Sequence, residues 1–313
     1  MTDPTEPESA ESGVGAVATR CGFIALVGAP NAGKSTLLNA LVGTKVSIVT
    51  HKAQTTRAQI RGVVTDGPAQ IVFIDTPGIF APKRRLDRAM VTSAWTGAGD
   101  ADFVALIVDA ERGITPELEA LLEGLENIRH PKVLVLNKVD LLKREKLLAI
   151  SEQLNLRLNF EATFMISALK GDGVGDFLAW AGKRIPLGPW HFPEDQLTDL
   201  TLALTAAEVT REKLFLRIHD EIPYNSTVET ERFQIQQDGS YRIDQVIYVT
   251  RDTHKKIVLG AGGQTIKAIG AESRKELIEI FETPVHLFLF VKVREKWSDD
   301  PERYREMGLE WTK

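Results

Sequence analysis

The residues whose spacing points most directly to chemistry lie near the start of the 313-residue chain. Residues 28–35 read Gly-Ala-Pro-Asn-Ala-Gly-Lys-Ser, a complete G-x-x-x-x-G-K-S pattern between the strand-like run FIALV and the helix-like run STLLNALV. Glycine at both ends lets backbone N–H groups turn inward around a phosphate, and the start of a helix adds a positive dipole end. We expect Lys34 to bridge the β- and γ-phosphates of a nucleotide and the Ser35 hydroxyl to ligate Mg²⁺. The alternative is a glycine-rich turn that binds nothing.

A carboxylate for the same metal is expected where the next long strand ends. Asp75 opens the sequence Asp-Thr-Pro-Gly after the run QIVFI, and we expect it to hold Mg²⁺ through water. Gly78 has no side chain to block close approach, so its N–H can sense the γ-phosphate, and the segment that follows becomes a switch. Thr55 and Thr56 lie in a polar loop between these motifs, and one of them should complete the metal shell. Thr56 is favoured, although either threonine could be only a strand-edge residue.

A third motif selects the base. Asn137-Lys138-Val139-Asp140 follows the apolar run KVLVL, and a carboxylate at Asp140 accepts hydrogen bonds from guanine N1–H and N2–H₂, donors that adenine lacks. Asn137 should reach the other edge of the base, and the Lys138 stem should cover its face. The backbone of residues 167–169, after the run ATFMI, should contact the guanine O6. The alternative for Asp140 is an ordinary cap of the next helix.

These motifs predict a GTP/GDP site. Lys34, Thr56 and Gly78 are assigned to catalysis, and Ser35, Thr56 and Asp75 to the metal. The full set of expected nucleotide contacts is Gly28, Ala29, Pro30, Asn31, Ala32, Gly33, Lys34, Ser35, Thr36, Asp75, Thr76, Pro77, Gly78, Asn137, Lys138, Val139, Asp140, Ser167, Ala168 and Leu169.

The elements that must position these residues are buried strands. Five nearly continuous apolar runs alternate with helical stretches between about residues 22 and 188, a pattern typical of parallel strands covered on both faces. It predicts a doubly wound, mostly parallel α/β sheet whose ligand site lies where strands end. Prolines 186, 189 and 193 then interrupt helix and strand alike. We therefore expect a domain over residues 20–188 and a second unit over residues 189–313.

The second unit reads as helix, two strands, two helices and a strand, with Gly260-Ala261-Gly262-Gly263 between the two central helices. This α+β order matches a type II KH domain, in which a G-x-x-G loop brings backbone close to a nucleic-acid strand. Residues 251–275 hold six basic and two acidic side chains, so positive charge gathers where phosphates would lie. The alternative is a flexible helix end. The expected RNA contacts are Lys255, Lys256, Gly260, Ala261, Gly262, Gly263, Lys267, Arg274 and Lys275.

Bulk composition limits the remaining classes of function. A formal net charge of -5 gives no overall attraction to polyanions, so a nucleic-acid contact must be local. The single cysteine, Cys21, cannot form an intrachain disulfide, which favours a reducing cytoplasm. Residues 1–19 are acidic, contain no basic side chain and lack the pattern of a targeting peptide, so a disordered tail is expected. The longest apolar runs are far too short to span a bilayer, which restricts any membrane contact to the periphery.

The motifs together resemble the translation-factor-related GTPases of the TrmE-Era-EngA-EngB-Septin-like group, and more narrowly its Era family. The segments GAPNAGKSTLLNALVG, KAQTTR, DTPGI, NKVD, HFPEDQLTD, REKL and VHLFLFVKV occur in the order found there, and the resemblance runs from about residue 22 to 300. It implies a GTP-hydrolysing protein whose KH domain binds small-subunit (16S) ribosomal RNA near its 3′ end. It also implies a role in 30S ribosomal subunit assembly, with nucleotide state controlling RNA binding.

Further expectations follow from the same resemblance. Ile79 occupies the place where many GTPases carry a water-orienting glutamine, so slow intrinsic hydrolysis is expected. Asn31 matches a position that in related GTPases helps hold potassium near the phosphates. A cytoplasmic monomer with peripheral cell-membrane association is expected. The rival functions are tRNA modification or large-subunit assembly, an RNA-binding adaptor with a degenerate nucleotide site, and membrane stress signalling.

Overall fold

A computed structural model describes residues 18–52, 54–219 and 221–311. The expected acidic tail lies almost wholly outside these residues. A six-stranded sheet has the order β2-β3-β1-β4-β5-β6. Its strands are β1 (Arg20–Val27), β2 (Ile60–Asp66), β3 (Ala69–Asp75), β4 (Phe103–Asp109), β5 (Lys132–Asn137) and β6 (Ala162–Met165). Only β2 pairs antiparallel, with β3, while the other pairings are parallel. The expected doubly wound, mostly parallel sheet is thereby confirmed.

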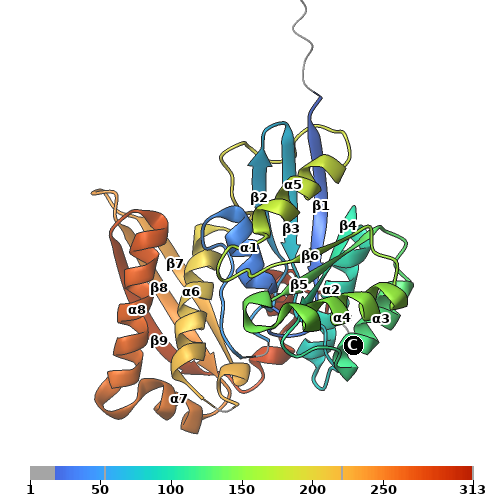
Figure 1. The fold of residues 1–313 in the computed structure, drawn as a ribbon. Helices are drawn as coiled ribbons and strands as arrows, with labels where there is room; N and C mark the ends of the chain where they lie inside the picture. The colour runs from blue at the N-terminus through green and yellow to red at the C-terminus, as the bar shows by residue number, and fades with distance from the viewer. Residues whose placement is uncertain (1–17, 53, 220, 312–313) are drawn as a thin grey trace, which may run out of the picture.

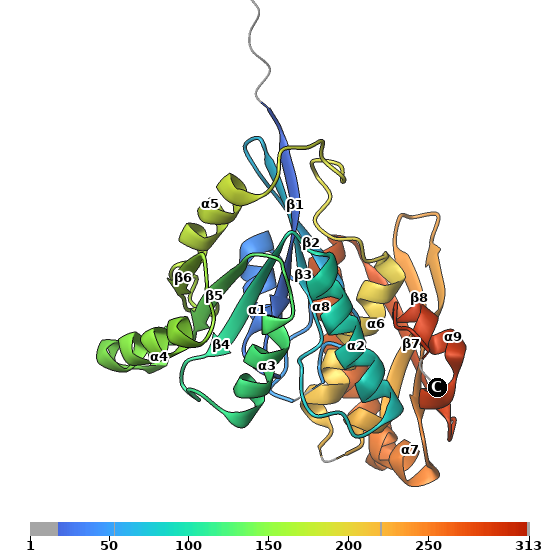
Figure 2. The same ribbon diagram turned by 90° about the vertical axis from the view of Figure 1, so that its right-hand side faces the viewer.

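Helices cover both faces of this sheet, which is why the strands β1, β3, β4 and β5 are mostly buried and apolar. One core contains side chains from α1 (Lys34–Val42) and α5 (Val174–Arg184). The opposite core contains side chains from α2 (Arg85–Asp100), α3 (Pro116–Glu126) and α4 (Arg144–Arg157). Figure 2 shows α5 and α2 on opposite sides of the strands. This three-layer arrangement brings the loops after β1, β3 and β5 to one edge of the sheet.

The C-terminal domain has the helix and strand order expected for a type II KH domain. Its elements are α6 (Leu202–Arg217), β7 (Ser226–Ile235), β8 (Tyr241–Val249), α7 (Asp252–Leu259), α8 (Gln264–Phe281) and β9 (Val285–Val293). The sheet order is β7-β8-β9, with β7 antiparallel and β9 parallel to β8. Apolar residues of α6, α7 and α8 pack on one face of this sheet. Figure 1 shows α6 between α8 and α1, so the two domains lie side by side.

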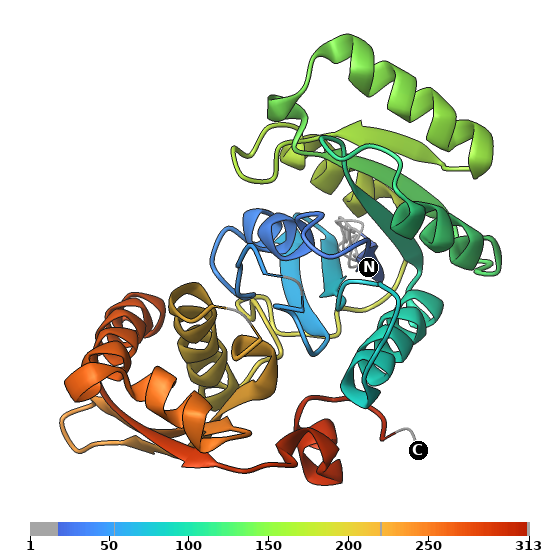
Figure 3. The same cartoon turned by 90° about the horizontal axis from the view of Figure 1, so that it is seen from below.

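The C-terminal segment returns to the first domain. After the short helix η4 (Trp297–Asp299), helix α9 (Pro301–Glu306) and the residues that follow pack against α2. Leu86 and Met90 of α2 share this apolar cluster with Trp297, Tyr304 and Leu309. Figure 3 shows the end of the chain, in red, reaching α2, in teal. The two domains therefore share buried apolar surface.

Residues 186–201, which join the two domains, pack along the first sheet. There, Val63 N–H donates to the Leu197 carbonyl at 2.9 Å. The domain boundary near residue 189 therefore stays a prediction.

Among the described residues no helix is both long enough and apolar enough to cross a lipid bilayer.

Candidate active site

The three nucleotide motifs meet around one cavity of about 760 Å³ at the carboxyl ends of the strands. This is the edge at which open parallel sheets bind ligands. Of the residues expected to contact a nucleotide, the cavity is lined by Pro30, Asn31, Gly33, Lys34, Ser35, Thr36, Gly78, Asn137, Lys138, Asp140, Ser167, Ala168 and Leu169. Gly28, Ala29, Ala32, Asp75, Thr76, Pro77 and Val139 are not among the lining residues.

The loop between β1 and α1 has a geometry that only glycine permits at two positions. A Cβ at Gly28 would lie 2.4 Å from the Ile107 carbonyl oxygen. Gly33 has a φ of +98°, and a Cβ there would lie 2.1 Å from Nδ2 of Asn137. The phosphate loop and the N-K-x-D motif are thus in direct contact, which neither motif alone would indicate.

Lys34 lies along the loop that precedes it. Its Nζ donates to the carbonyl oxygens of Gly28 and Ala29, both at 3.0 Å. The side chain is buried, and desolvation lowers the pKa of Lys34 to about 8 although the Asp75 carboxylate opposes the shift. An ammonium group stripped of water and held by carbonyls is well placed to exchange those acceptors for phosphate oxygens.

Hydroxyl and carboxylate oxygens converge beside Lys34. Asp75 Oδ2 accepts hydrogen bonds from Ser35 Oγ at 2.6 Å and from Ser47 Oγ at 2.9 Å, and Thr56 Oγ1 lies 2.9 Å from Ser35 Oγ. Thr55 instead bonds to Thr50 and to the Lys52 carbonyl. The structure therefore places Thr56, and not Thr55, with the other two candidate metal ligands.

This oxygen cluster fits a magnesium ion. Asp75 is fully buried, and its Oδ1 has no hydrogen-bond partner among the described residues. Burial raises the pKa of Asp75, so a cation nearby would stabilise the carboxylate. The donors are all hard oxygens, which Mg²⁺ prefers. Serine and threonine hydroxyls and an unpaired carboxylate oxygen thus satisfy the chemistry expected for the metal.

The base-recognition motif is held in place by its neighbours. Asn137 Nδ2 donates to the Ala32 carbonyl and its Oδ1 accepts from Ala168 N–H, both at 2.9 Å. Lys138 has a φ of +65° and pairs with Asp109 at 2.6 Å. Asn137 therefore connects the phosphate loop to the loop after β6.

Asp140 remains available to a ligand within this framework. Hydrogen bonding from Ser167, together with Lys170, holds the pKa of Asp140 below its ordinary value, so its carboxylate is charged at neutral pH. Lys170 Nζ lies 3.2 Å from Asp140 Oδ2. A charged carboxylate at the cavity wall can accept the two donors of a guanine base.

The segment after Asp75 is packed closely onto the phosphate loop. A Cβ at Gly78 would lie 2.9 Å from Pro30 Cα, so only glycine fits there. The next residue, Ile79, is buried in the core and its N–H donates to the Gly28 carbonyl at 3.2 Å. Asn31 has a φ of +63° and donates from Nδ2 to the His51 carbonyl at 2.9 Å. No polar side chain stands at position 79 to orient water.

The glycine-rich turn of the C-terminal domain is equally specific. Gly260 has a φ of +72°, and a Cβ there would lie 2.2 Å from Thr265 Oγ1. Gly262 and Gly263 also have positive φ, while Ala261 and Gly262 are exposed. The chain therefore passes from α7 to α8 with its backbone uncovered.

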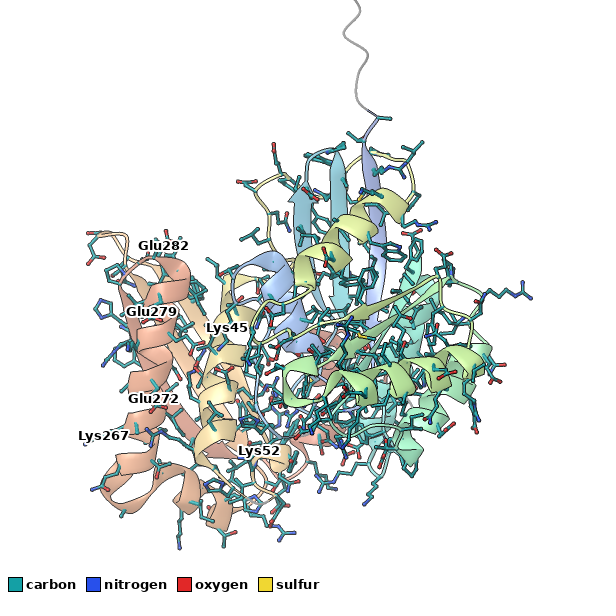
Figure 4. The ribbon with its side chains drawn as sticks, viewed as in Figure 1. Lys45, Lys52, Lys267, Glu272, Glu279 and Glu282 are labelled. Atoms are coloured by element: carbon teal, nitrogen blue, oxygen red, sulfur yellow. The ribbon has the colours of Figure 1, made fainter. Side chains whose placement is uncertain are left out.

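The five cations predicted to contact RNA lie on α7 and α8 around this turn. None of them forms an ion pair with a described acidic side chain. Figure 4 shows Lys267 on the outer side of α8, away from the first domain. Arg274 and Lys275 lie 7 to 8 residues farther along the helix, which is about 11 Å from Lys267 at ~1.5 Å per residue. The three cations of α8 are therefore spread along this helix.

Sequence reasoning missed several residues of the nucleotide site. Ser47 bonds to Asp75, Asp109 pairs with Lys138, and Lys170 pairs with Asp140, although these residues lie in different loops. Only Asp109, at the end of an apolar run, carried a signal, because polar residues at strand ends commonly line such sites.

Comparisons with known proteins agree with both domains. A protein-family model described as a 50S ribosome-binding GTPase matches residues 23–138, and a KH domain model matches residues 221–298. GTPase Era from Rhizobium meliloti is 61% identical over 313 residues, covering 100% of both chains. GTPase Era from Brucella suis is 60% identical, covering 99% of each chain.

Solved structures extend the similarity to three dimensions. A crystal structure of Era in complex with MgGDPNP and nucleotides 1506–1542 of 16S ribosomal RNA matches with a TM-score of 0.87 and 37% identity. The match covers 93% of this chain and 99% of that one. An Aquifex aeolicus Era variant bound to GDP.AlF4⁻ matches with the same TM-score, identity and coverage.

Proposed function

This chain belongs to the GTPase Era family and is a GTPase, and from that premise we propose that its nucleotide state controls binding to small-subunit ribosomal RNA during 30S assembly. The observation that carries the proposal is the coexistence of two intact sites in one chain. The phosphate loop, oxygen cluster and guanine motif surround one cavity, and an uncovered glycine turn flanked by unpaired cations lies in the other domain. The residues expected to hold phosphate, metal and guanine are all present, whereas Ile79 replaces a water-orienting glutamine and Ala261 and Gly262 leave the turn without a basic side chain.

We assign the steps of GTP binding to residues of the first domain. Backbone N–H groups of residues 28–36 and the Lys34 ammonium hold the phosphates, and Asp140 selects guanine. Ser35, Thr56 and Asp75 would hold Mg²⁺, which when bound neutralises charge on the β- and γ-phosphates. Gly78 N–H contacts the γ-phosphate, so loss of that group releases the segment after it.

Hydrolysis transfers the γ-phosphoryl group to water and leaves GDP and phosphate. Lys34 stabilises charge on the oxygens of the transferred group, and the bond to the β–γ bridging oxygen breaks. Because Ile79 is buried and apolar, water is oriented by backbone, by another loop or by a partner, and intrinsic turnover is slow. We also propose that Asn31 helps hold K⁺ near the phosphates. Equal hydrolysis rates in sodium and potassium salts would remove that role.

RNA binding is assigned to α7, the glycine turn and α8. A KH turn clamps about four nucleotides, and phosphates would lie near Lys255, Lys256, Lys267, Arg274 and Lys275. The contrast with the opposite face of the KH sheet supports this side. There, Arg242 pairs with Asp244 and Lys292 with Glu231, so those cations are already neutralised. Unpaired cations are the ones that gain most from a phosphate.

The test of the proposal measures RNA affinity in two nucleotide states. A labelled RNA that carries the 3′ end of small-subunit ribosomal RNA is titrated with the protein in GDP and in a non-hydrolysable GTP analogue, with transfer RNA as the competitor. We expect tighter binding of the ribosomal RNA than of transfer RNA, and affinity that depends on the nucleotide. Preference for transfer RNA would overturn the assembly role.

A second candidate function is large-subunit assembly, which the 50S ribosome-binding description of the matching family model favours. That match covers residues 23–138 and so excludes the KH domain. Co-sedimentation of the protein with 30S and 50S precursors in GTP analogue separates the two candidates. Association with the 50S particle alone would favour the second.

We further propose a cytoplasmic monomer that associates peripherally with the cell membrane. Anionic lipid headgroups would bind to the same exposed lysines and arginines that would contact RNA phosphates. Flotation with vesicles containing anionic lipids, before and after addition of RNA, tests this assignment. Binding that RNA does not displace, or no binding at all, would contradict a shared surface.

A further inference from the structure

The segment that carries Thr56 contacts the C-terminal domain at several residues. We call its described residues between α1 and β2, 44–52 and 54–59, the switch segment. Lys45 pairs with Glu212 of α6 at 2.6 Å and with Glu276 of α8. Val49 N–H donates to Glu212 Oε1 at 2.9 Å, and Lys52 Nζ donates to carbonyls at the end of α6. Figure 4 shows Lys45 and Lys52 where the two domains meet.

Arg57 makes the most specific of these attachments. Its Nη1 donates to the Ser226 carbonyl at 2.9 Å and its Nη2 to the Pro223 carbonyl at 3.1 Å. The guanidinium lies 5.5 Å from the ring centroids of both Phe215 and Trp297. All four partners belong to the C-terminal domain, while Arg57 itself directly follows Thr56 in the first domain.

Burying the charged side chain of Arg57 costs desolvation free energy, so a contribution to stability does not explain why an arginine occupies this position. Arg57 is 4% exposed, and desolvation lowers its pKa to about 9, with Arg211 adding repulsion. Its Nε has no hydrogen-bond partner among the described residues. Apolar side chains commonly stabilise such a buried position as well as a charged group does. What a planar guanidinium adds is a fixed direction, because its N–H groups project in a rigid fork.

The turn that accepts Arg57 also contacts the segment after Gly78. This turn is η2 (Pro223–Asn225), which leads into β7. Arg84, the residue before α2, donates from Nη1 to Asn225 Oδ1 at 3.0 Å, and Trp297 Nε1 donates to the Asn225 carbonyl at 3.0 Å. The η2 turn of the C-terminal domain therefore contacts both the switch segment, through Arg57, and the segment after Gly78, through Arg84.

We infer that Arg57 is a positioning residue through which the C-terminal domain holds the Thr56 hydroxyl in the triphosphate site. The carbonyls of Pro223 in η2 and of Ser226 at the start of β7, together with the rings of Phe215 and Trp297, fix the guanidinium. Because Thr56 is the preceding residue, this anchor sets the backbone that presents Oγ1 to Ser35. The inference rests on the guanine-nucleotide site proposed above and does not depend on the identity of the RNA.

The test compares affinities for GDP and for a non-hydrolysable GTP analogue in the full-length protein. Thr56 is expected to act only in the triphosphate state, so Arg57→Ala should weaken analogue binding about tenfold and leave GDP affinity within about twofold. The Mg²⁺ concentration that supports half-maximal analogue binding should rise. Arg57→Lys should recover only part of the analogue affinity, because an ammonium cannot satisfy both carbonyls in the fork geometry.

A second variant changes a residue of the C-terminal domain that contacts Arg57. Trp297→Leu removes one ring from around the guanidinium, and we expect it to reduce the preference for the analogue in the same direction. Combined with Arg57→Ala it should add nothing further. Arg61→Ala is the matched control, because Arg61 lies nearby on β2 and pairs with Asp199 at 2.8 Å without touching the η2 turn. We expect no change in its nucleotide preference.

Each outcome decides the inference. Equal loss of GDP and analogue affinity in Arg57→Ala, or an equal effect of Arg61→Ala, would show a general structural role and overturn it. If Arg57→Ala does not fold, unchanged nucleotide preference in both Arg57→Lys and Trp297→Leu would overturn it as well. Failure of the unsubstituted protein to bind guanine nucleotides would instead refute the proposed function.

Discussion

Replacing Asp140 by asparagine tests base selection without removing any other part of the site. The carboxylate lies at the cavity wall, and among the described residues it forms an ion pair only with Lys170, a side chain that is 58% exposed. Because Lys170 is so exposed, loss of its ion pair with Asp140 should leave the free energy of unfolding nearly unchanged. Asparagine keeps the size of the side chain but presents one acceptor and one donor group, where aspartate presents only acceptors.

The expected loss is large because two charge-assisted hydrogen bonds are involved. Each such bond contributes roughly tenfold to a hundredfold in affinity, so GTP binding should fall by about 10²- to 10⁴-fold. Xanthine carries a carbonyl where guanine carries N2–H₂, and the new amide can donate to it. Xanthosine triphosphate should therefore bind Asp140→Asn more tightly than GTP does.

The assay is competition against a fluorescent guanine nucleotide, with GTP, xanthosine triphosphate and ATP as competitors. Melting temperature serves as the folding control, and Lys170→Ala reports how much of the effect comes from the ion pair alone. Two results would refute the assignment of Asp140: GTP affinity within about threefold of the unsubstituted protein, or no gain for xanthosine triphosphate.

Three further outcomes are expected. Gly260→Val should reduce affinity for single-stranded RNA at least ~10-fold, measured by fluorescence anisotropy, and leave GTP hydrolysis intact. The reason is that a side chain at this position meets Thr265 and strains a positive φ. Loss of both activities would contradict this. Lys34, with its pKa lowered to about 8, is charged below that pH and neutral above it, so nucleotide binding at pH 9 should take up a proton. Calorimetry in two buffers of different ionisation enthalpy measures that uptake, and identical heats would argue against it. Phe177→Ala should cost about 3–5 kcal/mol of unfolding free energy in urea titration, because Phe177 is fully buried, whereas Leu156→Ala at an exposed position should cost little.

Local sequence predicts the parts of this protein whose geometry is set by neighbouring residues. The phosphate loop needs Gly28 and Gly33 where the backbone must pass close to Ile107 and Asn137, and Lys34 and Ser35 follow at fixed spacing. The apolar runs predicted buried parallel strands, and the turn at Asp238 and Gly239 does join β7 to β8. Short-range constraints of this kind are visible in sequence because the residues that impose them are adjacent.

Contacts between distant segments were not predictable in the same way. Strand β2 was missed because its sequence IRGVVTD is interrupted by polar residues and by Gly62, whose missing side chain makes room for Leu38 of α1. The choice between Thr55 and Thr56 stayed open because adjacent hydroxyls have no distinguishing pattern. The anchoring of Arg57 at Ser226 joins residues 169 positions apart. No periodicity or motif records a contact of that range.

The return of the C-terminal segment to α2 has a consequence for synthesis on the ribosome. The apolar face around Met90 is covered by Trp297 and Tyr304, residues that are translated about 200 positions later. At ~5–20 residues per second, that face stays bare for on the order of 10–40 s after it leaves the exit tunnel. The first domain therefore completes its packing only after α9 has been synthesised. Until then the apolar face of α2 is exposed to solvent and is a binding site for chaperones.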